Sequence, residues 1–374
     1  MKIIYIVKTK LHYYPPCVSQ IRMLKKIGID VEVLYGTSNT SALDLLKKEQ
    51  IKYKKIGNMT DENNTKLKKA ISWLKFRIYL KKELKKYSSD ENIIIWFGTG
   101  ETVLPMIGLL RKYNYITTFL ELYDETPIKI KLLKKIANNA VAVTVCEKDR
   151  AYIMQYWWKL KKLPYVFPNK PYNLTRKKRI TPTIELTEKI INKIKNDNII
   201  LYQGIIQNTE ELVEFAKALN LTKKHYKFLI MGIDKYNSIK EIKKYYSDIE
   251  YIEYIPAPFH LEITSYARIG ITFYRPDSLN KVYCAPNKIY EYTGFGIPVI
   301  CNDIPGLVNT IGNSNSGKCI EIKCNEIVKT IDFIEENYND LSKNAVKFFD
   351  STDNLSEIEK LINEIECKMG KKCH

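Results

Sequence analysis

The chain has 374 residues, of which 45% are hydrophobic and 27% charged, which predicts a globular protein of two domains rather than a disordered one. No run of about 18 apolar residues occurs, which excludes a membrane-spanning helix, and the short apolar start predicts a first strand rather than a signal peptide. The net charge of +18 favours a polyanionic partner, although richness in Lys, Ile, Asn and Tyr offers compositional bias as an alternative.

The eight cysteines are scattered and form no CxxC pair, and only four histidines are present. This composition predicts no structural zinc site. Without a secretory signal, we expect reduced thiols and a cytoplasmic location.

The first half of the chain alternates strand-like and helix-like segments. Strands are predicted at 2–7, 30–35, 93–97, 116–122 and 140–146, and helices at 18–27 and 102–112. Three prolines and a basic run between 163 and 179 then indicate a linker.

Alternation restarts after a helix predicted at 186–195. Strands are expected at 199–203, 227–231, 249–254, 269–273 and 299–301, with a helix at 210–219 and a terminal helix at 355–369. The pattern predicts an α/β protein with two Rossmann-like domains facing across a cleft. The expected parts are a first Rossmann-like domain at 1–170, a second at 171–350, and a C-terminal helix and tail at 351–374 that could return to the first domain.

The segment 286–300 is the most informative motif. Lys288 and Glu291 lie three residues apart, on one face of a helical turn, and the glycines at 294 and 296 precede a short buried strand. A charge at the start of a helix, at the carboxyl end of a sheet, typically holds a phosphorylated ligand. The alternative is an ordinary surface Lys–Glu pair.

The same segment resembles the signature of retaining glycosyltransferases with two Rossmann domains (the GT-B architecture, group-1 or family-4 type), and its Pro-Asn-Lys start is similar to a surface-polysaccharide branch. The match comprises Glu291, Gly296, Pro298 and the following strand. Segments 202–204, 166–169 and 254–270 are similar to the family's donor-domain turn, the end of its acceptor domain and the strand, loop and short helix before the signature. The chain departs from the family in three places: Tyr283 replaces a first glutamate, Ile205 to Gln207 replace a basic pair, and Arg268 replaces an aspartate.

The resemblance implies that the domain at 1–170 binds the acceptor and the domain at 171–350 binds the donor. It also implies a nucleoside diphosphate sugar as donor and substrate, with no metal and no cofactor. Glu291 would accept hydrogen bonds from ribose hydroxyls, and Lys288 is the first candidate to contact the diphosphate, with Arg275 and Lys281 as helpers. The remaining donor-site candidates are Gly204, Asn280, Tyr283 and Asn287. The glycine would let the backbone approach the diphosphate, and the asparagines could instead cap a helix or shape a turn.

On the acceptor side, Glu121 and Asp124 follow a predicted strand, and either could orient or deprotonate an acceptor hydroxyl. The alternative is a solvated acidic loop with Asp124 as a helix cap. Gly98 to Glu101 end another strand, and His12 in the first loop is a further candidate.

Two basic and aromatic clusters lie in the first half. The segment 66–86 holds nine basic residues and one acid, with Trp73 and Phe76 among its aromatics, and Trp157 and Trp158 precede a second lysine cluster. Such a pattern favours docking on the anionic inner face of a membrane, whereas the alternative is a packed helix with solvated lysines.

We therefore predict a cytoplasmic, membrane-associated glycosyltransferase acting on a glycan or lipid-linked acceptor in surface polysaccharide synthesis. The rivals are a nucleotide-sugar epimerase of the same architecture, a non-catalytic relative, and a basic nucleic-acid-binding protein. No nucleic-acid partner is expected, because no recognition motif accompanies the charge.

Overall fold

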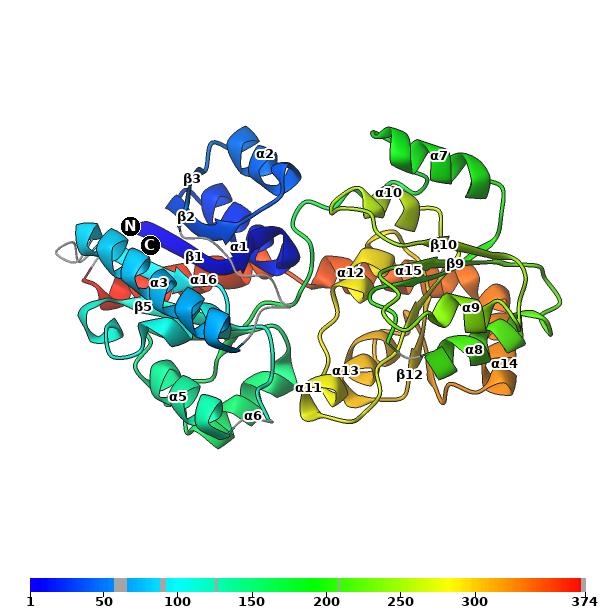
Figure 1. Cartoon of the computed structure of the whole chain (residues 1–374). Helices are drawn as coiled ribbons and strands as arrows, with labels where there is room; N and C mark the ends of the chain where they lie inside the picture. Colours follow the sequence, from blue (N-terminus) through cyan, green and yellow to red (C-terminus); the bar gives the residue numbers. More distant parts are fainter. Residues whose placement is uncertain (57–65, 88–91, 125–126, 208, 371–374) are drawn as a thin grey trace. The chain divides into compact units, whose positions relative to one another are not determined.

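The computed structural model describes residues 1–56, 66–87, 92–124, 127–207 and 209–370 (Figure 1). Contacts divide the chain into two compact units. Unit 1 comprises Met1–Tyr172 and Asp353–His374, and unit 2 comprises Asn173–Thr352.

Unit 1 is built on a parallel sheet of seven strands in the order β3-β2-β1-β4-β5-β6-β7. Its strands are β1 (Lys2–Lys10), β2 (Asp30–Thr37), β3 (Lys52–Lys55), β4 (Ile93–Phe97), β5 (Tyr115–Phe119), β6 (Ala142–Val145) and β7 (Tyr165–Val166). Its α-helices are α1 (Pro15–Lys26), α2 (Thr40–Lys48), α3 (Lys66–Leu84), α4 (Gly100–Val103), α5 (Pro127–Asn138), α6 (Lys148–Trp158) and α16 (Asn354–Lys368). Short 3-10 turns are η1 (Leu11–Tyr13), η2 (Lys85–Tyr87), η3 (Leu104–Met106) and η4 (Leu110–Lys112).

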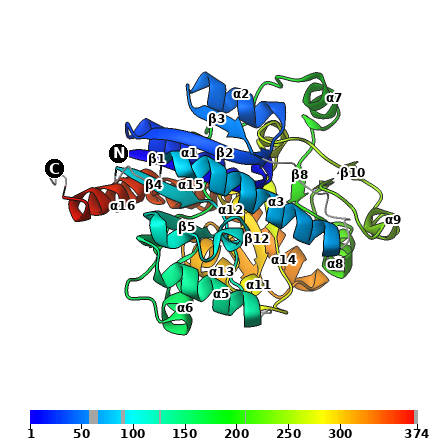
Figure 2. The same ribbon diagram turned by 60° about the vertical axis from the view of Figure 1, so that its left-hand side comes forward.

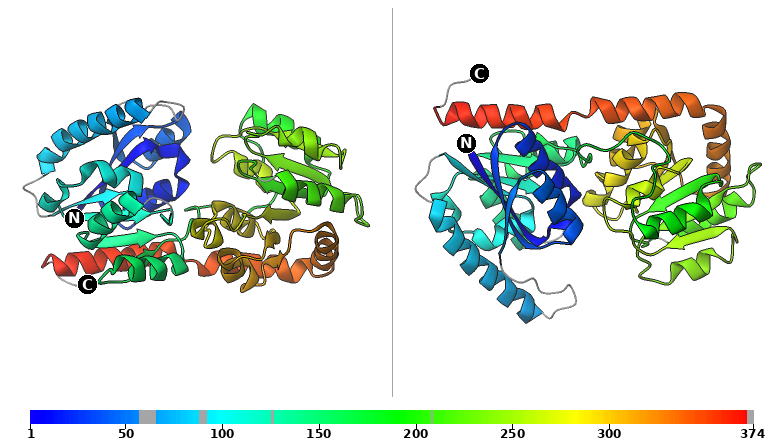
Figure 3. Two further views of the ribbon diagram at one scale, coloured as in Figure 1. Left: turned by 60° about the horizontal axis from the view of Figure 1, so that its bottom comes forward. Right: turned by 90° about the horizontal axis from the view of Figure 1, so that it is seen from above.

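The C-terminal helix α16 returns to unit 1, as the sequence predicted, and lies along it in Figure 3. Its apolar face, including Ile358, Leu361 and Ile365, is buried in one cluster with Tyr5 and Trp96 of the central strands. This face has the helical spacing of three and four residues, and so α16 completes the core of unit 1.

The single helix expected at 102–112 is wrong. The structure has α4, η3 and η4 there instead, with Gly108 at a φ of +81° between the last two. Pro105 lacks an amide donor and a left-handed glycine ends helical geometry, so the segment cannot form one continuous helix.

Unit 2 is built on a parallel sheet of six strands in the order β10-β9-β8-β11-β12-β13. Its strands are β8 (Ile199–Gln203), β9 (Lys227–Met231), β10 (Ile249–Ile252), β11 (Ile269–Thr272), β12 (Val299–Asn302) and β13 (Gly317–Ile320). Its helices are α7 (Glu185–Ile194), α8 (Thr209–Leu219), α9 (Ser238–Ile242), α10 (His260–Thr264), α11 (Leu279–Val282), α12 (Asn287–Gly294), α13 (Pro305–Leu307), the π-helical η5 (Val308–Gly312), α14 (Cys324–Glu336) and α15 (Tyr338–Ser351).

Both sheets are sandwiched between helices, because their strands are apolar on both faces. The strand β4 reads Ile-Ile-Ile-Trp-Phe and β8 reads Ile-Ile-Leu-Tyr-Gln, and every residue of both is buried. Strands of this kind are typical of parallel sheets covered on both sides. The predicted α/β fold with two Rossmann-like parts is confirmed.

Candidate active site

The strand order of unit 2 has its switch point between β8 and β11. The chain adds β9 and β10 on one side of β8 and then returns to add β11, β12 and β13 on the other. At such a switch point the connections leaving the strands diverge, and doubly wound proteins bind ligands at the carboxyl ends there. Gly204 directly follows β8 and Tyr274 follows β11 closely, so both lie at this edge.

Lys288 lies against the Gly204 turn. Gly204 has a φ of +129°, and a Cβ atom built there would lie 3.0 Å from the Lys288 ammonium nitrogen. That nitrogen also lies 4.8 Å from the ring centroid of Tyr202 and 5.5 Å from that of Tyr274. The glycine therefore leaves room for the cation, and two aromatic rings cover it.

The surroundings of Lys288 disfavour its charge. Burial lowers the pKa of Lys288 from 10.5 to about 8, and the nearby Glu291 only partly opposes this effect. A cation held away from water in this way gains more from an incoming anion than a solvated lysine does. Lys288 is also the second residue of α12, whose first-turn amides favour negative charge.

Glu291 is buried and held by residues from two other segments. The side-chain amide of Gln203 donates a hydrogen bond to one carboxylate oxygen, and His260 Nε2 lies 3.3 Å from the other. The Thr264 hydroxyl in turn donates to the side-chain oxygen Oε1 of Gln203 at 2.8 Å. This chain of contacts fixes the orientation of the carboxylate that the family resemblance assigns to the donor.

Sequence reasoning missed Gln203, His260 and Thr264. Gln203 alone carried a signal, since a polar residue ends an otherwise apolar buried strand directly before the Gly204 turn. His260 and Thr264 lie in α10, a short helix that has nothing in its local sequence to mark a site.

The other donor candidates lie between β11 and β12. Asn280 is in α11, Tyr283 directly follows that helix, and Asn287 is the first residue of α12. Their connection starts from the carboxyl end of β11, and their roles stay predictions.

The proposed helpers of Lys288 already have carboxylate partners. Arg275 pairs with Glu210 and Glu211 of α8, each at 2.7 Å, and Lys281 pairs with Asp277 at 2.6 Å. An incoming diphosphate would have to displace these carboxylates, and so Lys288 is the better candidate for the anion.

Arg268, which replaces the family's aspartate, has a structural role. Its guanidinium donates to both carboxylate oxygens of Glu335 in α14, at 3.0 and 2.9 Å, and lies over the ring of Tyr338. Together with Lys224, this pairing lowers the pKa of Glu335 to about 2 despite its partial burial. The substitution thus joins the start of β11 to the outer helix.

Unit 1 has a switch point of its own between β1 and β4. The backbone amide of Lys8 in β1 donates to the Thr102 hydroxyl at 3.0 Å, which joins β1 to the helix after β4. Burial lowers the pKa of Lys8 to about 8, opposed by the nearby Glu101. A second desolvated lysine therefore lies at the corresponding edge of unit 1.

The acceptor-side candidates lie at this edge. Glu121 and Asp124 follow β5, and the buried hydroxyl of Tyr123 between them has a raised pKa, mainly from burial and then from Glu101 and Glu121. His12 Nδ1 accepts a hydrogen bond from the Asn39 amide at 3.0 Å. Burial, and secondarily Lys10, lowers the pKa of His12, which favours the neutral ring. The catalytic roles of Glu121 and Asp124 stay predictions.

Two of the four predicted membrane-docking residues are wrong. Trp158 is 1% exposed and packs edge-on against Phe119, and Phe76 is 4% exposed. Both rings belong to the interior of unit 1, because they lie on the inward faces of α6 and α3. Trp73 and Trp157 remain at the surface, 36% and 39% exposed, respectively.

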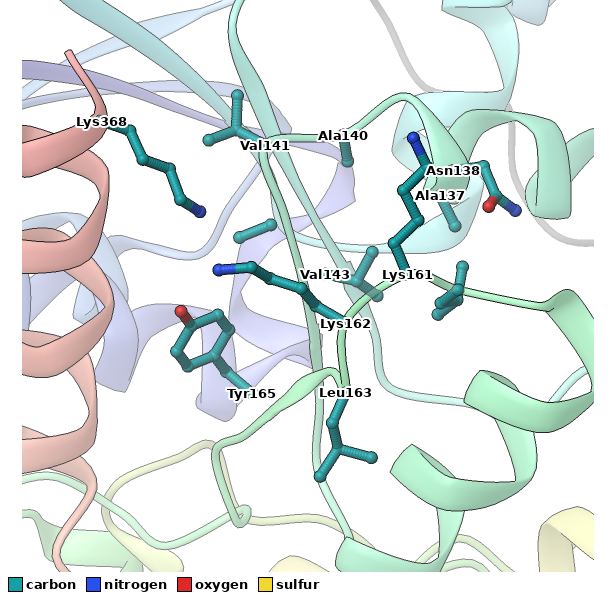
Figure 4. Close-up of a pocket in the computed structure, with 12 residues that line it drawn as sticks. Ala137, Asn138, Ala140, Val141, Val143, Lys161, Lys162, Leu163, Tyr165 and Lys368 are labelled. Atoms are coloured by element: carbon teal, nitrogen blue, oxygen red, sulfur yellow. The ribbon is translucent and has the colours of Figure 1, made fainter.

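A pocket of about 210 Å³ lies between β6, β7 and α16, with Lys162, Lys368 and Tyr165 converging at one end of it (Figure 4). Its lining includes Val141 and Leu163, which precede β6 and β7, and so it lies at the amino ends of these strands. Parallel sheets bind ligands at the opposite edge, which argues against an active site here.

Among the residues that the structure describes, no group of three or more His, Cys, Asp or Glu side chains could hold a metal ion. No helix within the described ranges is both long enough and apolar enough to cross a membrane.

Several solved structures share the fold over nearly the whole chain. A glycosyltransferase from Rickettsia africae ESF-5 is 17% identical with a TM-score of 0.65, covering 99% of both chains. HepE from Anabaena, solved with UDP-glucose, is 12% identical with a TM-score of 0.67, covering 98% of this chain and 100% of that one. A putative UDP-N-acetylglucosamine 2-epimerase from Listeria monocytogenes is 12% identical with a TM-score of 0.60, covering 100% and 98%.

No protein-family model matches the chain, and no curated protein matches it by sequence. The structural likeness, at these identities, establishes the fold, which is the GT-B architecture expected from the sequence.

Proposed function

We propose that the protein is a glycosyltransferase that moves a sugar, of the hexose type and with retained anomeric configuration, from a nucleoside diphosphate sugar to an acceptor hydroxyl. Unit 2 would bind the donor and unit 1 the acceptor. The observation that carries the proposal is the desolvated Lys288 at the Gly204 turn, at the switch point of the unit 2 sheet. The GT-B fold, shared with HepE, which was solved in complex with UDP and with UDP-glucose, supports the same function.

The chemistry follows from the charge of the leaving group. The bond between the anomeric carbon and the diphosphate oxygen breaks, and its electron pair goes to the diphosphate. The Lys288 ammonium and the first amides of α12 would stabilise the charge that develops there. The held carboxylate of Glu291 would accept hydrogen bonds from the ribose hydroxyls and fix the nucleoside.

The acceptor hydroxyl oxygen bonds to the anomeric carbon and must lose its proton. Glu121 and Asp124 are the candidates to receive it, because both follow β5 at the carboxyl edge of the unit 1 sheet. No metal or cofactor is needed for these steps, since Lys288 supplies the positive charge.

We place the enzyme at the cytoplasmic face of a membrane, in surface polysaccharide synthesis with a glycan or lipid-linked acceptor. The helix α3, at the front of Figure 2, supports this placement. Ile71, Leu74 and Ile78 form an exposed apolar face on it, flanked by exposed lysines at 68, 75, 81, 82 and 85. An exposed apolar face among lysines is typical of a helix that rests on anionic lipid.

Thermal shift and calorimetric titration with UDP, GDP, CDP and ADP test the donor site. We expect at least one nucleotide to bind, and Lys288→Ala to weaken it roughly 100-fold. Lys281→Ala is the matched control, because this nearby lysine already pairs with Asp277 and should bind normally. Failure of all four nucleotides, or equal losses in both variants, would refute the donor-site assignment.

A nucleotide-sugar epimerase is the second candidate, favoured by the likeness to the Listeria epimerase over the full chain. An epimerase converts its nucleotide sugar without an acceptor, whereas a glycosyltransferase releases nucleoside diphosphate in step with glycoside formation. Incubation with the nucleotide sugar that binds, with and without candidate acceptors, followed by NMR of the sugar, separates the two.

A further inference from the structure

An apolar groove lies within unit 1, beside α3. It has a volume of about 680 Å³, in the usual range for small-molecule sites of about 300–1,000 Å³. Its apolar walls are contributed by α3, the turn η3 with the residue that follows it, and α5, mainly through Trp73, Leu74, Leu104, Ile107, Ile128 and Leu132. Ile128 and Leu74 are among the most exposed large apolar residues of unit 1, which leaves this concave surface open to a partner.

The cations around the groove outnumber the acids. Arg77, Lys129 and Glu101 line it. Arg77 donates to the backbone carbonyls of η3 and its flank, and Lys129 pairs with Glu101. The Lys8 ammonium lies 4.9 Å from the ring centroid of Trp73, whose indole lines the groove.

Lys8 does not line the groove itself but places a cation next to it, beside Trp73. Its side chain is buried, and burial lowers its pKa to about 8. Glu101 lies near Lys8 but is already paired with Lys129, so two lysines share one carboxylate. A ligand that brings a negative charge to this point would neutralise the second lysine charge.

We propose that the groove binds the hydrocarbon chain of a lipid-linked acceptor, whose phosphate lies toward Lys8 and Lys129. This inference rests on the proposed function and names the acceptor class: a lipid that carries both an apolar chain and a phosphate. The apolar walls select the chain and the excess positive charge selects the phosphate. The position of Lys8 at the β1–β4 switch point would bring the head group to the carboxyl edge where Glu121 and Asp124 lie.

A bilayer surface alone does not explain the groove. A flat membrane would contact the exposed face of α3 that carries Ile71, Leu74 and Ile78, whereas a concave surface with walls from three elements fits a single chain. Leu74 and Ile78 lie one turn apart on the same helix and are each 59% exposed, but only Leu74 lines the groove. They provide a matched pair of variants, since neither side chain is part of the core.

The test uses the full chain and farnesyl phosphate at concentrations below micelle formation, with binding measured by equilibrium dialysis. We expect saturable one-to-one binding, unchanged in Ile78→Glu and weakened at least about tenfold in Leu74→Glu, because a carboxylate in the groove opposes both chain and phosphate. Leu132→Glu, on the opposite wall, should repeat the loss. The proposal would be overturned if farnesyl phosphate below micelle formation showed no saturable binding, or if the Leu74 and Ile78 variants lost equal affinity for it.

Farnesol and inorganic phosphate test the two halves of the ligand separately. Farnesol should bind more weakly than farnesyl phosphate. Lys8→Met should reduce that difference more than Lys129→Ala does, because Lys129 already pairs with Glu101. Equal binding of farnesol and farnesyl phosphate would refute the role given to the cations. Nucleotide binding by the same samples distinguishes the two proposals. If the protein binds farnesyl phosphate but no nucleotide, the proposed glycosyltransferase function is refuted. If it binds nucleotide but not farnesyl phosphate, only the proposal for the groove is refuted.

Discussion

The switch points of the two sheets share one feature, a lysine that lies near two aromatic rings. Lys8 in unit 1 lies near the rings of Trp73 and Phe76, and Lys288 in unit 2 lies near those of Tyr202 and Tyr274. In both, burial lowers the pKa of the lysine to about 8, with one glutamate nearby opposing it. Each unit therefore keeps a desolvated cation at the edge where its fold binds ligands.

The surroundings of the two lysines differ, and this difference indicates two kinds of ligand. Lys288 lies against a glycine turn and the start of α12, beside a carboxylate fixed by Gln203 and His260, which is a polar setting suited to a nucleotide. Lys8 adjoins an apolar groove, and its neighbour Glu101 is paired with Lys129. If both lysines bind anions as proposed, their different neighbours would determine what carries the anion.

Exchange of each lysine for methionine is expected to give the largest effects. Methionine keeps the apolar volume and removes the charge. Lys288→Met should weaken nucleotide binding roughly 100-fold and leave farnesyl phosphate binding intact. Lys8→Met should leave nucleotide binding intact and weaken farnesyl phosphate binding, by less than about 100-fold because Lys129 remains. Calorimetric titration of both ligands against both variants measures this, and parallel losses would show that the two lysines do not serve separate sites.

The pH dependence of nucleotide binding should show the next largest effect. With a pKa of about 8 in the free protein, Lys288 is mainly protonated at pH 7 and mainly neutral at pH 9. Nucleotide affinity should therefore fall by up to about tenfold per pH unit above 8, with proton uptake on binding. Lys288→Arg, which stays charged, should lose this slope. A wild-type affinity that stays constant to pH 9.5 would contradict the prediction.

The same shift sets the sign of a stability effect. Folding lowers the pKa of Lys288 from 10.5, so between about pH 8 and 10.5 the unfolded chain holds more protons than the folded one. Burial of this charged lysine thus lowers the free energy of unfolding, fully below pH 8 and less and less as the pH rises through that window. At pH 7, Lys288→Met should unfold at a higher temperature than the wild type, an advantage that shrinks by pH 10.

Gly204→Ala should have a moderate effect on binding. The new Cβ atom would lie 3.0 Å from the Lys288 ammonium nitrogen and would displace it, which we expect to weaken nucleotide binding about tenfold. Gly108→Ala is the control, because Gly108 also has a positive φ, +81°, but nothing lies within 4 Å of a Cβ there. Both variants should lose about 1–2 kcal/mol of stability from backbone strain. Similar nucleotide affinities in the two variants would separate Gly204 from the site.

Gln203→Ala should have the smallest effect. It removes one hydrogen-bond donor to Glu291 and should weaken nucleotide binding only a few-fold, which corresponds to about 1 kcal/mol of binding free energy. If Glu291 binds the ribose, the variant should also discriminate less between ribonucleotides and 2′-deoxyribonucleotides, a change that simple destabilisation would not cause. Thr264→Val removes the hydroxyl contacts to Gln203 and to the His260 carbonyl but no direct contact to Glu291, and so should be closer to the wild type. An unchanged ribose preference in Gln203→Ala would exclude the positioning role.

Much of the site could be predicted because its signals are local. Gly204 after an apolar strand, and Lys288 and Glu291 three residues apart before another strand, are readable from a few neighbouring positions. The membrane prediction failed at Phe76 and Trp158 for the complementary reason: an aromatic ring among lysines looks the same whether its face of the helix is buried or exposed.

The sequence by itself determined the alternation of strands and helices, and with it two parallel sheets, because the periods of side-chain direction depend only on local backbone geometry. It also determined that Lys288 and Glu291 lie three residues apart on one helical turn before a buried strand. Only the tertiary structure decided which residues hold that glutamate. Gln203 and His260 lie 88 and 31 positions from Glu291 in the chain and meet it only through the strand order. The groove beside Lys8 depends on packing in the same way, since its walls come from three separate elements.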